Sequence, residues 1–214
     1  MSLIVTVDGP GGTGKSTVSR VVAQRAGLPH LDTGAFYRAA TLAVLRAGVD
    51  PSEGPAIAGT VARTRLDQEH GRTYLNEVDV SNEIRGETVT KAVSAVSTHP
   101  EVRGILVEMQ REWLGRHENR GVVEGRDIGS VVFPDAEVKV YLSARPEIRA
   151  QRRALQTGND PSEVLIDLNR RDHIDSTRAA SPLTIPDGAV VIDTSNLTFA
   201  QVVDRVLALI RAKS

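Results

Sequence analysis

Eight residues near the N-terminus have the types and the spacing that bind phosphate. Residues 9–16 read Gly-Pro-Gly-Gly-Thr-Gly-Lys-Ser and match the pattern G-x-x-x-x-G-K-[ST] at every position. The glycines let backbone N–H groups point at a phosphate. Lys15 can reach the β and γ phosphates of a nucleoside triphosphate, and the Ser16 hydroxyl can bind Mg²⁺. We therefore expect a nucleoside triphosphate to contact Gly9, Pro10, Gly11, Gly12, Thr13, Gly14, Lys15, Ser16 and Thr17.

The loop predicts a triphosphate but does not identify what receives the phosphate. A switch GTPase needs an Asn-Lys-x-Asp sequence, and none of the lysines lies in one. A nucleic-acid motor needs a basic track, whereas the chain has 26 basic and 27 acidic residues and a net charge of −1. Two arginines indicate a second, small anionic substrate. Arg38 follows residues 32–37, and Arg126 lies just beyond an expected strand, where ligands bind in open α/β sheets.

The phosphate motif needs a strand before it and a helix after it, and hydrophobic periodicity predicts both. Strands are expected at residues 3–7, 121–124, 137–142 and 189–193. Helices are expected at residues 16–26, 33–47, 146–155 and 198–211. This alternation of strand and helix predicts an α/β fold with a parallel sheet and helices on both faces.

Two stretches interrupt the alternation. Residues 63–80 are polar, with a Glu-His-Gly-Arg turn at residues 69–72, and are expected to form a small antiparallel insert. Its β-prone pieces are residues 61–66 and 73–78. Residues 157–178 are charged and helical, and we expect them to form a mobile excursion from the core.

Composition excludes several classes of protein. The chain has no Cys, so disulfides, thiolate nucleophiles and iron–sulfur clusters are ruled out. Aromatic residues make up only 3% of the chain, too few for a base-stacking surface, and Trp113 is expected in the core. The apolar run at residues 3–7 is too short for a signal peptide, and no stretch approaches the ~18 apolar residues of a membrane span. We expect a cytoplasmic protein that binds neither nucleic acid nor membrane.

The chain resembles the bacterial cytidylate kinases from about residue 3 to its C-terminus. The resemblance rests on the phosphate loop at residues 8–17 and on three more specific segments. They are Asp-Thr-Gly-Ala-Phe-Tyr-Arg at 32–38, Gly-Arg-Asp-Ile-Gly-Ser-Val-Val-Phe-Pro at 125–134, and Arg-Asp-His-Ile-Asp-Ser-Thr-Arg at 171–178.

This resemblance implies a P-loop kinase core with a five-stranded parallel sheet, a monophosphate-binding domain that carries the antiparallel insert, and a helical lid. The core would comprise residues 1–35, 109–147 and 181–214, the monophosphate-binding domain residues 36–108, and the lid residues 148–180. The implied reaction is transfer of the γ-phosphoryl group of ATP to CMP or dCMP, with Mg²⁺, in pyrimidine metabolism. A monomer is expected from the resemblance.

The resemblance also implies roles for individual residues. Catalysis would use Lys15, Arg126, Arg171 and Arg178. ATP would contact Arg149 and Arg153 in addition to the phosphate loop. CMP would contact Thr33, Arg38, Ser94, Arg103, Arg126, Asp127, Arg171, Asp175 and Arg178.

Departures from the family pattern and three alternatives accompany this reading. Thr33 stands where the family often has Ser, and Glu124 where Asp is common; its carboxylate could help to hold Mg²⁺ through water. An adenylate-type or shikimate-type kinase would share the phosphate loop. A module that uses ATP only as a switch would share it too, but would not need Arg38, Arg126 or Arg178.

Overall fold

The computed structural model describes residues 2–178 and 180–213 and divides the chain into two compact units. The first unit comprises Met1–His30 and Asn119–Ser214, and the second comprises Leu31–Glu118. The phosphate loop belongs to the first unit and the polar insert to the second. The functional division into core, monophosphate-binding domain and lid stays a prediction.

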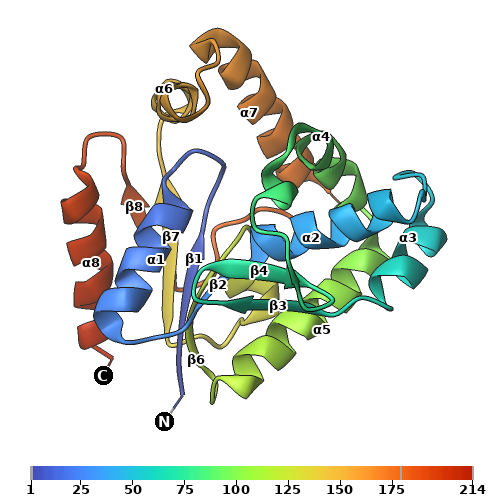
Figure 1. The fold of residues 1–214 in the computed structure, drawn as a ribbon. Helices are drawn as coiled ribbons and strands as arrows, with labels where there is room; N and C mark the ends of the chain where they lie inside the picture. Colours follow the sequence, from blue (N-terminus) through green and yellow to red (C-terminus); the bar gives the residue numbers. More distant parts are fainter. Residues whose placement is uncertain (1, 179, 214) are drawn as a thin grey trace. The chain divides into compact units, whose positions relative to one another are not determined.

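The larger sheet has five strands in the order β2-β6-β1-β7-β8 (Figure 1). They are β1 (Leu3–Asp8), β2 (His30–Asp32), β6 (Arg120–Glu124), β7 (Val138–Ser143) and β8 (Val190–Asp193). β1 pairs in parallel with β6 and β7, and β7 with β8. The four strands expected from sequence are confirmed, with ends shifted by a residue at most. β2 is too short to show a periodic pattern, and no bounds are predicted for it.

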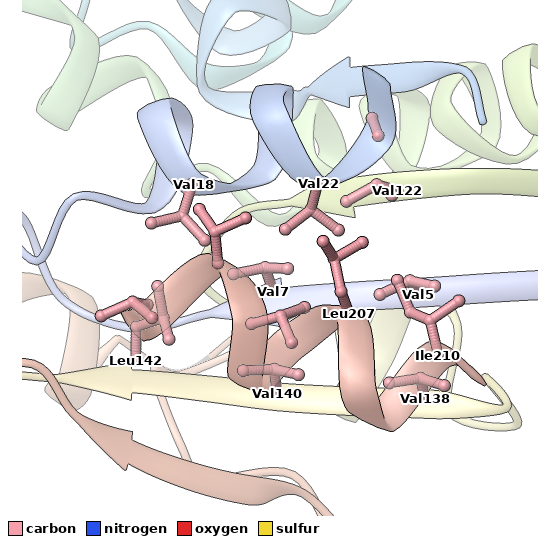
Figure 2. Close-up of a cluster of buried hydrophobic side chains, with 14 of the residues drawn as sticks. Val5, Val7, Val18, Val22, Val122, Val138, Val140, Leu142, Leu207 and Ile210 are labelled. Atoms are coloured by element: carbon pink, nitrogen blue, oxygen red, sulfur yellow. The ribbon is translucent and has the colours of Figure 1, made fainter. Parts of the chain in front are cut away.

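Helices and strands follow one another in the first unit as expected. Its helices are α1 (Lys15–Ala26), α6 (Pro146–Thr157), α7 (Pro161–Thr177) and α8 (Phe199–Arg211), with one π-helical turn, η2 (Ile128–Val132). α1 packs against α8, and Figure 2 shows Val18 and Val22 of α1 and Leu207 of α8 in one cluster with Val7 and Val140 of the sheet. These side chains are buried and hold the phosphate loop between two rigid elements.

α6 and α7 form a helical hairpin with a small core of its own. That core consists of Ala150, Ala154, Val164 and Leu168. Gly158 ends α6 with φ 75°, and the Asp160 side chain accepts hydrogen bonds from the first N–H groups of α7. The helical character expected for residues 157–178 is therefore confirmed.

The second unit is mostly helical. Its elements are α2 (Thr33–Arg46), α3 (Gly54–Val61), α4 (Glu87–Val96), α5 (Pro100–Arg116), the 3₁₀ turn η1 (Glu83–Arg85), and strands β3 (Leu66–Glu69), β4 (Arg72–Leu75) and β5 (Val78–Asp79). The three strands make an antiparallel sheet in the order β3-β4-β5. Trp113 of α5 is buried, as expected, and its indole N–H donates to the Gln68 carbonyl at 3.0 Å.

The antiparallel insert is confirmed, but the expected strand pieces are wrong in detail. Residues 61–66 are not a strand, because Ile57 and Val61 bury one face of α3 at helical spacing. Residues 73–78 are divided by a turn in which Asn76 has φ 49°. The expected turn at residues 69–72 is confirmed, with positive φ at both central residues, as a tight hairpin requires.

Within the described ranges, no helix has both the length and the apolar character needed to cross a membrane.

Candidate active site

The phosphate loop connects β1 to α1, as the motif requires. Gly9 has φ 140°, and a Cβ atom at this position would lie 2.1 Å from the Leu142 carbonyl oxygen. Only glycine can therefore bring the loop this close to β7. Gly14 precedes α1 with φ 91°, and within the described chain no side chain caps this helix. The first N–H groups of α1 are thus available to a phosphate, which the positive end of the helix dipole attracts.

Lys15 lies in the first turn of α1 and turns back over the loop. Its ammonium group donates to the Pro10 carbonyl at 2.7 Å. Burial, and to a smaller extent the positive charge of Arg126, lower the pKa of Lys15 to about 7, although the negative charges of Glu124 and Asp8 act in the opposite direction. An ammonium group that loses this much solvation gains strongly from an anion, so the position suits the β and γ phosphates of a nucleotide.

Ser16 and Glu124 provide two oxygen ligands for a cation beside the phosphate loop. The Ser16 hydroxyl donates to Glu124 Oε2 at 2.9 Å, and the Glu124 side chain is only 3% exposed. Hydroxyl and carboxylate oxygens are the ligands that Mg²⁺ prefers, and it commonly keeps several waters. The donor set therefore fits Mg²⁺. Although Glu124 is longer than the aspartate common in the family, it reaches the serine directly.

Asp8, at the end of β1, fixes the turn that carries Arg126 and Asp127. Its carboxylate accepts hydrogen bonds from the N–H groups of Ile128 and Gly129, both at 2.8 Å. The side chain is fully buried, and burial raises the pKa of Asp8 to about 6, with a smaller contribution from the negative charge of Asp127. The two backbone hydrogen bonds act in the opposite direction.

Arg126, Asp127, Asp175 and Arg178 form one cluster next to the phosphate loop. Arg126 donates to the Gly9 carbonyl at 2.6 Å and pairs with Asp175 at 3.0 Å. Arg178 pairs with Asp175 at 3.3 Å and with Asp127 at 3.6 Å. Four residues predicted to bind CMP, from two distant stretches of sequence, are thus brought together in the first unit.

The arginines of the α6–α7 hairpin divide into two groups. Arg149 is buried, donates to the Gly11 carbonyl at 3.1 Å and pairs with Asp172 at 2.5 Å. Arg171 pairs with Asp167 of its own helix at 3.0 Å, and Arg153 is exposed and donates to Gln156 at 3.4 Å. Of these three predicted residues, only Arg149 is placed by these contacts on the phosphate loop.

Four predicted CMP contacts lie on helices of the second unit. Arg38 of α2 donates to the Thr90 hydroxyl at 2.9 Å and to the Ile84 carbonyl at 3.2 Å. Arg103 of α5 is buried, with its guanidinium 5.1 Å above the centre of the Tyr37 ring. Thr33 is buried at the start of α2, and Ser94 is half-buried on α4.

The comparisons with known proteins decide the family. The family model for cytidylate kinase matches residues 5–212. A cytidylate kinase of Mycobacterium leprae is 50% identical over 219 residues, covering 99% of this chain and 97% of that protein. One from Rhodococcus opacus is 52% identical over 222 residues, covering 100% and 96%. The chain belongs to the cytidylate kinase family.

Solved structures with low identity support the fold alone. An uncharacterized protein from Eubacterium ventriosum is 11% identical with a TM-score of 0.56, and the match covers 99% of each chain. A sugar kinase from a Janibacter species is 14% identical with a TM-score of 0.52, covering 99% of this chain and 95% of that one. The predicted fold class is confirmed, with its five-stranded parallel sheet and a second, antiparallel sheet.

Three residues near the candidate active site have no predicted role. Asp8 and Asp172 stand within the family segments, but their partners lie far away in the sequence, so their contacts cannot be read from spacing. His30 gives no signal because an isolated histidine is usually a surface or core residue. Its ring lies 3.2 Å from the Glu124 carboxylate.

Proposed function

We propose that this member of the cytidylate kinase family transfers the γ-phosphoryl group of ATP to CMP or dCMP, giving ADP and CDP or dCDP. The observation that carries the proposal is the charge cluster of Arg126, Asp127, Asp175 and Arg178 directly beside the phosphate loop. A binding site for ATP alone does not require these residues. A kinase with a second, anionic substrate does.

The triphosphate is assigned to the phosphate loop and to the α6–α7 hairpin. The N–H groups at the start of α1 and the Lys15 ammonium would bind its phosphates, and Arg149 would add a second cation from α6. Bound with ATP, Mg²⁺ would neutralise charge on the phosphate oxygens. Ser16, with Glu124 behind it, would hold that ion.

The acceptor is assigned to the residues predicted to contact CMP. In the first unit, Arg126 and Arg178 would bind the phosphate of CMP, Asp127 the amino group of cytosine, and Asp175 the ribose. In the second unit, Arg38 would bind the phosphate, and Thr33, Ser94 and Arg103 the base. Arg171 is paired with Asp167, so it would have to break this ion pair to reach the transferring phosphoryl group.

The proposed chemistry needs no covalent intermediate. Phosphoryl transfer depends on alignment of the two reacting oxygens and on neutralisation of charge that spreads over the transferring group. Lys15, Arg126 and Arg178 can provide that charge. Each already has a hydrogen-bonding partner in the protein, so it is oriented before a substrate phosphate replaces that partner.

A panel of acceptors tests the proposal. ADP production from ATP would be measured with CMP, dCMP, AMP, shikimate and no acceptor. Rapid turnover restricted to CMP and dCMP supports the proposal. Turnover restricted to AMP or shikimate would move the chain to one of the two related kinase types. ATP binding without turnover on any acceptor would favour the nucleotide switch. The monomeric state, cytoplasmic location and lack of nucleic-acid partners remain part of the proposal.

A further inference from the structure

His30, Glu124 and Ser16 are connected in series in the first unit. His30 begins β2, and its side chain is 17% exposed. Its Nε2 atom lies 3.2 Å from Glu124 Oε1. The other oxygen of the same carboxylate, Oε2, accepts the hydroxyl hydrogen of Ser16 at 2.9 Å. One carboxylate therefore connects an imidazole to the serine of the phosphate loop.

Of these two contacts, the one between Ser16 and Glu124 has the geometry of a hydrogen bond, whereas His30 Nε2 and Glu124 Oε1 lie close together without that geometry. An ionised carboxylate can only accept, so the His30 nitrogen that faces it must carry a hydrogen. Ser16 has a single hydroxyl hydrogen, and it points at Glu124. The lone pairs of the Ser16 oxygen then face away from the carboxylate, which is the orientation that a cation needs.

We propose that His30 is a positioning residue for the metal site of the phosphate loop. It holds the Glu124 carboxylate in one rotation, and that rotation keeps the hydroxyl hydrogen of Ser16 on the carboxylate, so that the oxygen lone pairs are free to bind the cation. Partners of this kind, one step behind the ligands, commonly change metal affinity by about 10- to 100-fold. The inference rests on the proposed use of ATP with Mg²⁺ but does not depend on the identity of the acceptor.

The length of Glu124 explains why such a partner is useful here. A glutamate has one more rotatable bond than an aspartate, and ordering a long polar side chain costs more conformational entropy. Glu124 is almost fully buried at the end of β6, so a carboxylate oxygen that faced no donor would carry a desolvation cost. The ring of His30 lies 3.2 Å from the oxygen that Ser16 does not use, and a ring N–H at this distance lowers the cost by electrostatic attraction.

The experiment compares two variants of similar size and shape. His30→Gln keeps an N–H group near the position of Nε2, whereas His30→Met fills the same space without a donor. ATP affinity would be measured by calorimetry for both variants and the wild type, in saturating Mg²⁺ and in EDTA. The ratio of the two affinities isolates the contribution of the metal, and the exposed His70 provides a matched control in His70→Ala.

We expect His30→Met to reduce the Mg²⁺-dependent gain in ATP affinity by about tenfold while affinity in EDTA stays the same. His30→Gln should restore most of the gain, and His70→Ala should change neither value. An equal loss in EDTA and in Mg²⁺, or an unchanged gain in His30→Met, would overturn the inference. Failure of CMP turnover would leave these values unaffected, so the two proposals fail separately.

A second measurement covers the case in which His30→Met does not fold. Glu124→Gln removes the carboxylate charge and should reduce the same Mg²⁺-dependent gain. If His30 acts through Glu124, adding His30→Ala, which removes the ring, to Glu124→Gln should have no further effect on the gain, because the shared interaction is already lost. Additive losses would show that His30 acts by another route and would contradict the inference.

Discussion

Lys15 combines two properties that rarely occur together, a charge and a surrounding that disfavours charge. Burial and Arg126 lower its pKa to about 7, and its ammonium is held by the Pro10 carbonyl. The Lys15 ammonium would therefore be stabilised most in the transition state, when negative charge develops on the transferring phosphoryl group. We therefore expect Lys15→Met to lower kcat by about 10²-fold or more while CMP binding changes little. Steady-state kinetics and CMP titration test this, and a near-normal kcat would contradict the role.

Arg126 and Arg38 test the phosphate assignment in each unit. A buried phosphate that loses one charge-assisted hydrogen bond should lose about 1.5–3 kcal/mol of binding free energy. Arg126→Ala or Arg38→Ala should therefore weaken CMP binding at least about tenfold. Cytidine, which has no phosphate, serves as the control ligand and should bind both variants as it binds the wild type. Equal losses for CMP and cytidine would mean that the two arginines only support the structure.

Asp8 makes the stability of the protein depend on pH. Because folding raises its pKa from 3.8 to about 6, the native state holds this proton more tightly than the unfolded chain does. Its stabilising contribution is therefore complete below about pH 4 and is lost as pH rises through about 6. Two pKa units correspond to about 3 kcal/mol.

Urea unfolding of the wild type and of Asp8→Asn, from about pH 4 to about pH 7, measures this contribution. The difference in the free energy of unfolding, wild type minus variant, should fall by about 2–3 kcal/mol across that range. Subtracting the variant removes the titration of the other carboxyl groups. A difference that stays constant or rises with pH would show that the Asp8 carboxyl is not desolvated.

At the scale of elements, the phosphate loop depends on the close approach of Gly9 to β7. Gly9→Ala would place a Cβ atom 2.1 Å from the Leu142 carbonyl oxygen at φ 140°. We expect this substitution to cost at least about 2 kcal/mol of stability and to abolish ATP binding. Thermal unfolding and ATP titration measure the two effects.

Gly104 of α5 provides the matched control. A Cβ atom there would meet no heavy atom of the described residues within 4 Å, apart from the neighbours and the helix's own backbone. Gly104→Ala should therefore stabilise α5 by about 0.5–1 kcal/mol and leave ATP binding unchanged. If Gly9→Ala behaves like Gly104→Ala, the loop does not need the geometry described.

The helices and strands also show which parts of the structure the sequence alone could predict. The phosphate loop could be predicted because its motif is contiguous and its strand and helix lie directly beside it. The short pieces of the insert could not be placed, since the run around Val61 fits a strand and a helix equally well until α3 packs. The link between Asp8 and Gly129 spans 121 positions, and only the pairing of β1 with β6 brings the two together. The ion pair of Arg171 with Asp167 depends on side-chain rotation, which no motif specifies.

At the scale of the whole molecule, the central claim is the choice of base. Cytosine has an amino donor at N4 and an acceptor at N3, whereas uracil has an acceptor at O4 and a donor at N3. Asp127, in the first unit, is assigned to N4, and Arg103, in the second, to N3. Both side chains are buried, so a mismatched base would leave charged groups poorly paired.

The most direct test is the ratio of kcat/KM for CMP to that for UMP, in the wild type and in Asp127→Asn. Sites built on such hydrogen bonds discriminate by up to about 10⁴-fold, so CMP and dCMP should be good acceptors, UMP poor, and AMP and GMP nearly inert. Asp127→Asn keeps the shape of the side chain but can also present a donor, so it should narrow the ratio. Equal use of UMP and CMP by the wild type, or an unchanged ratio in the variant, would contradict the account of base selection.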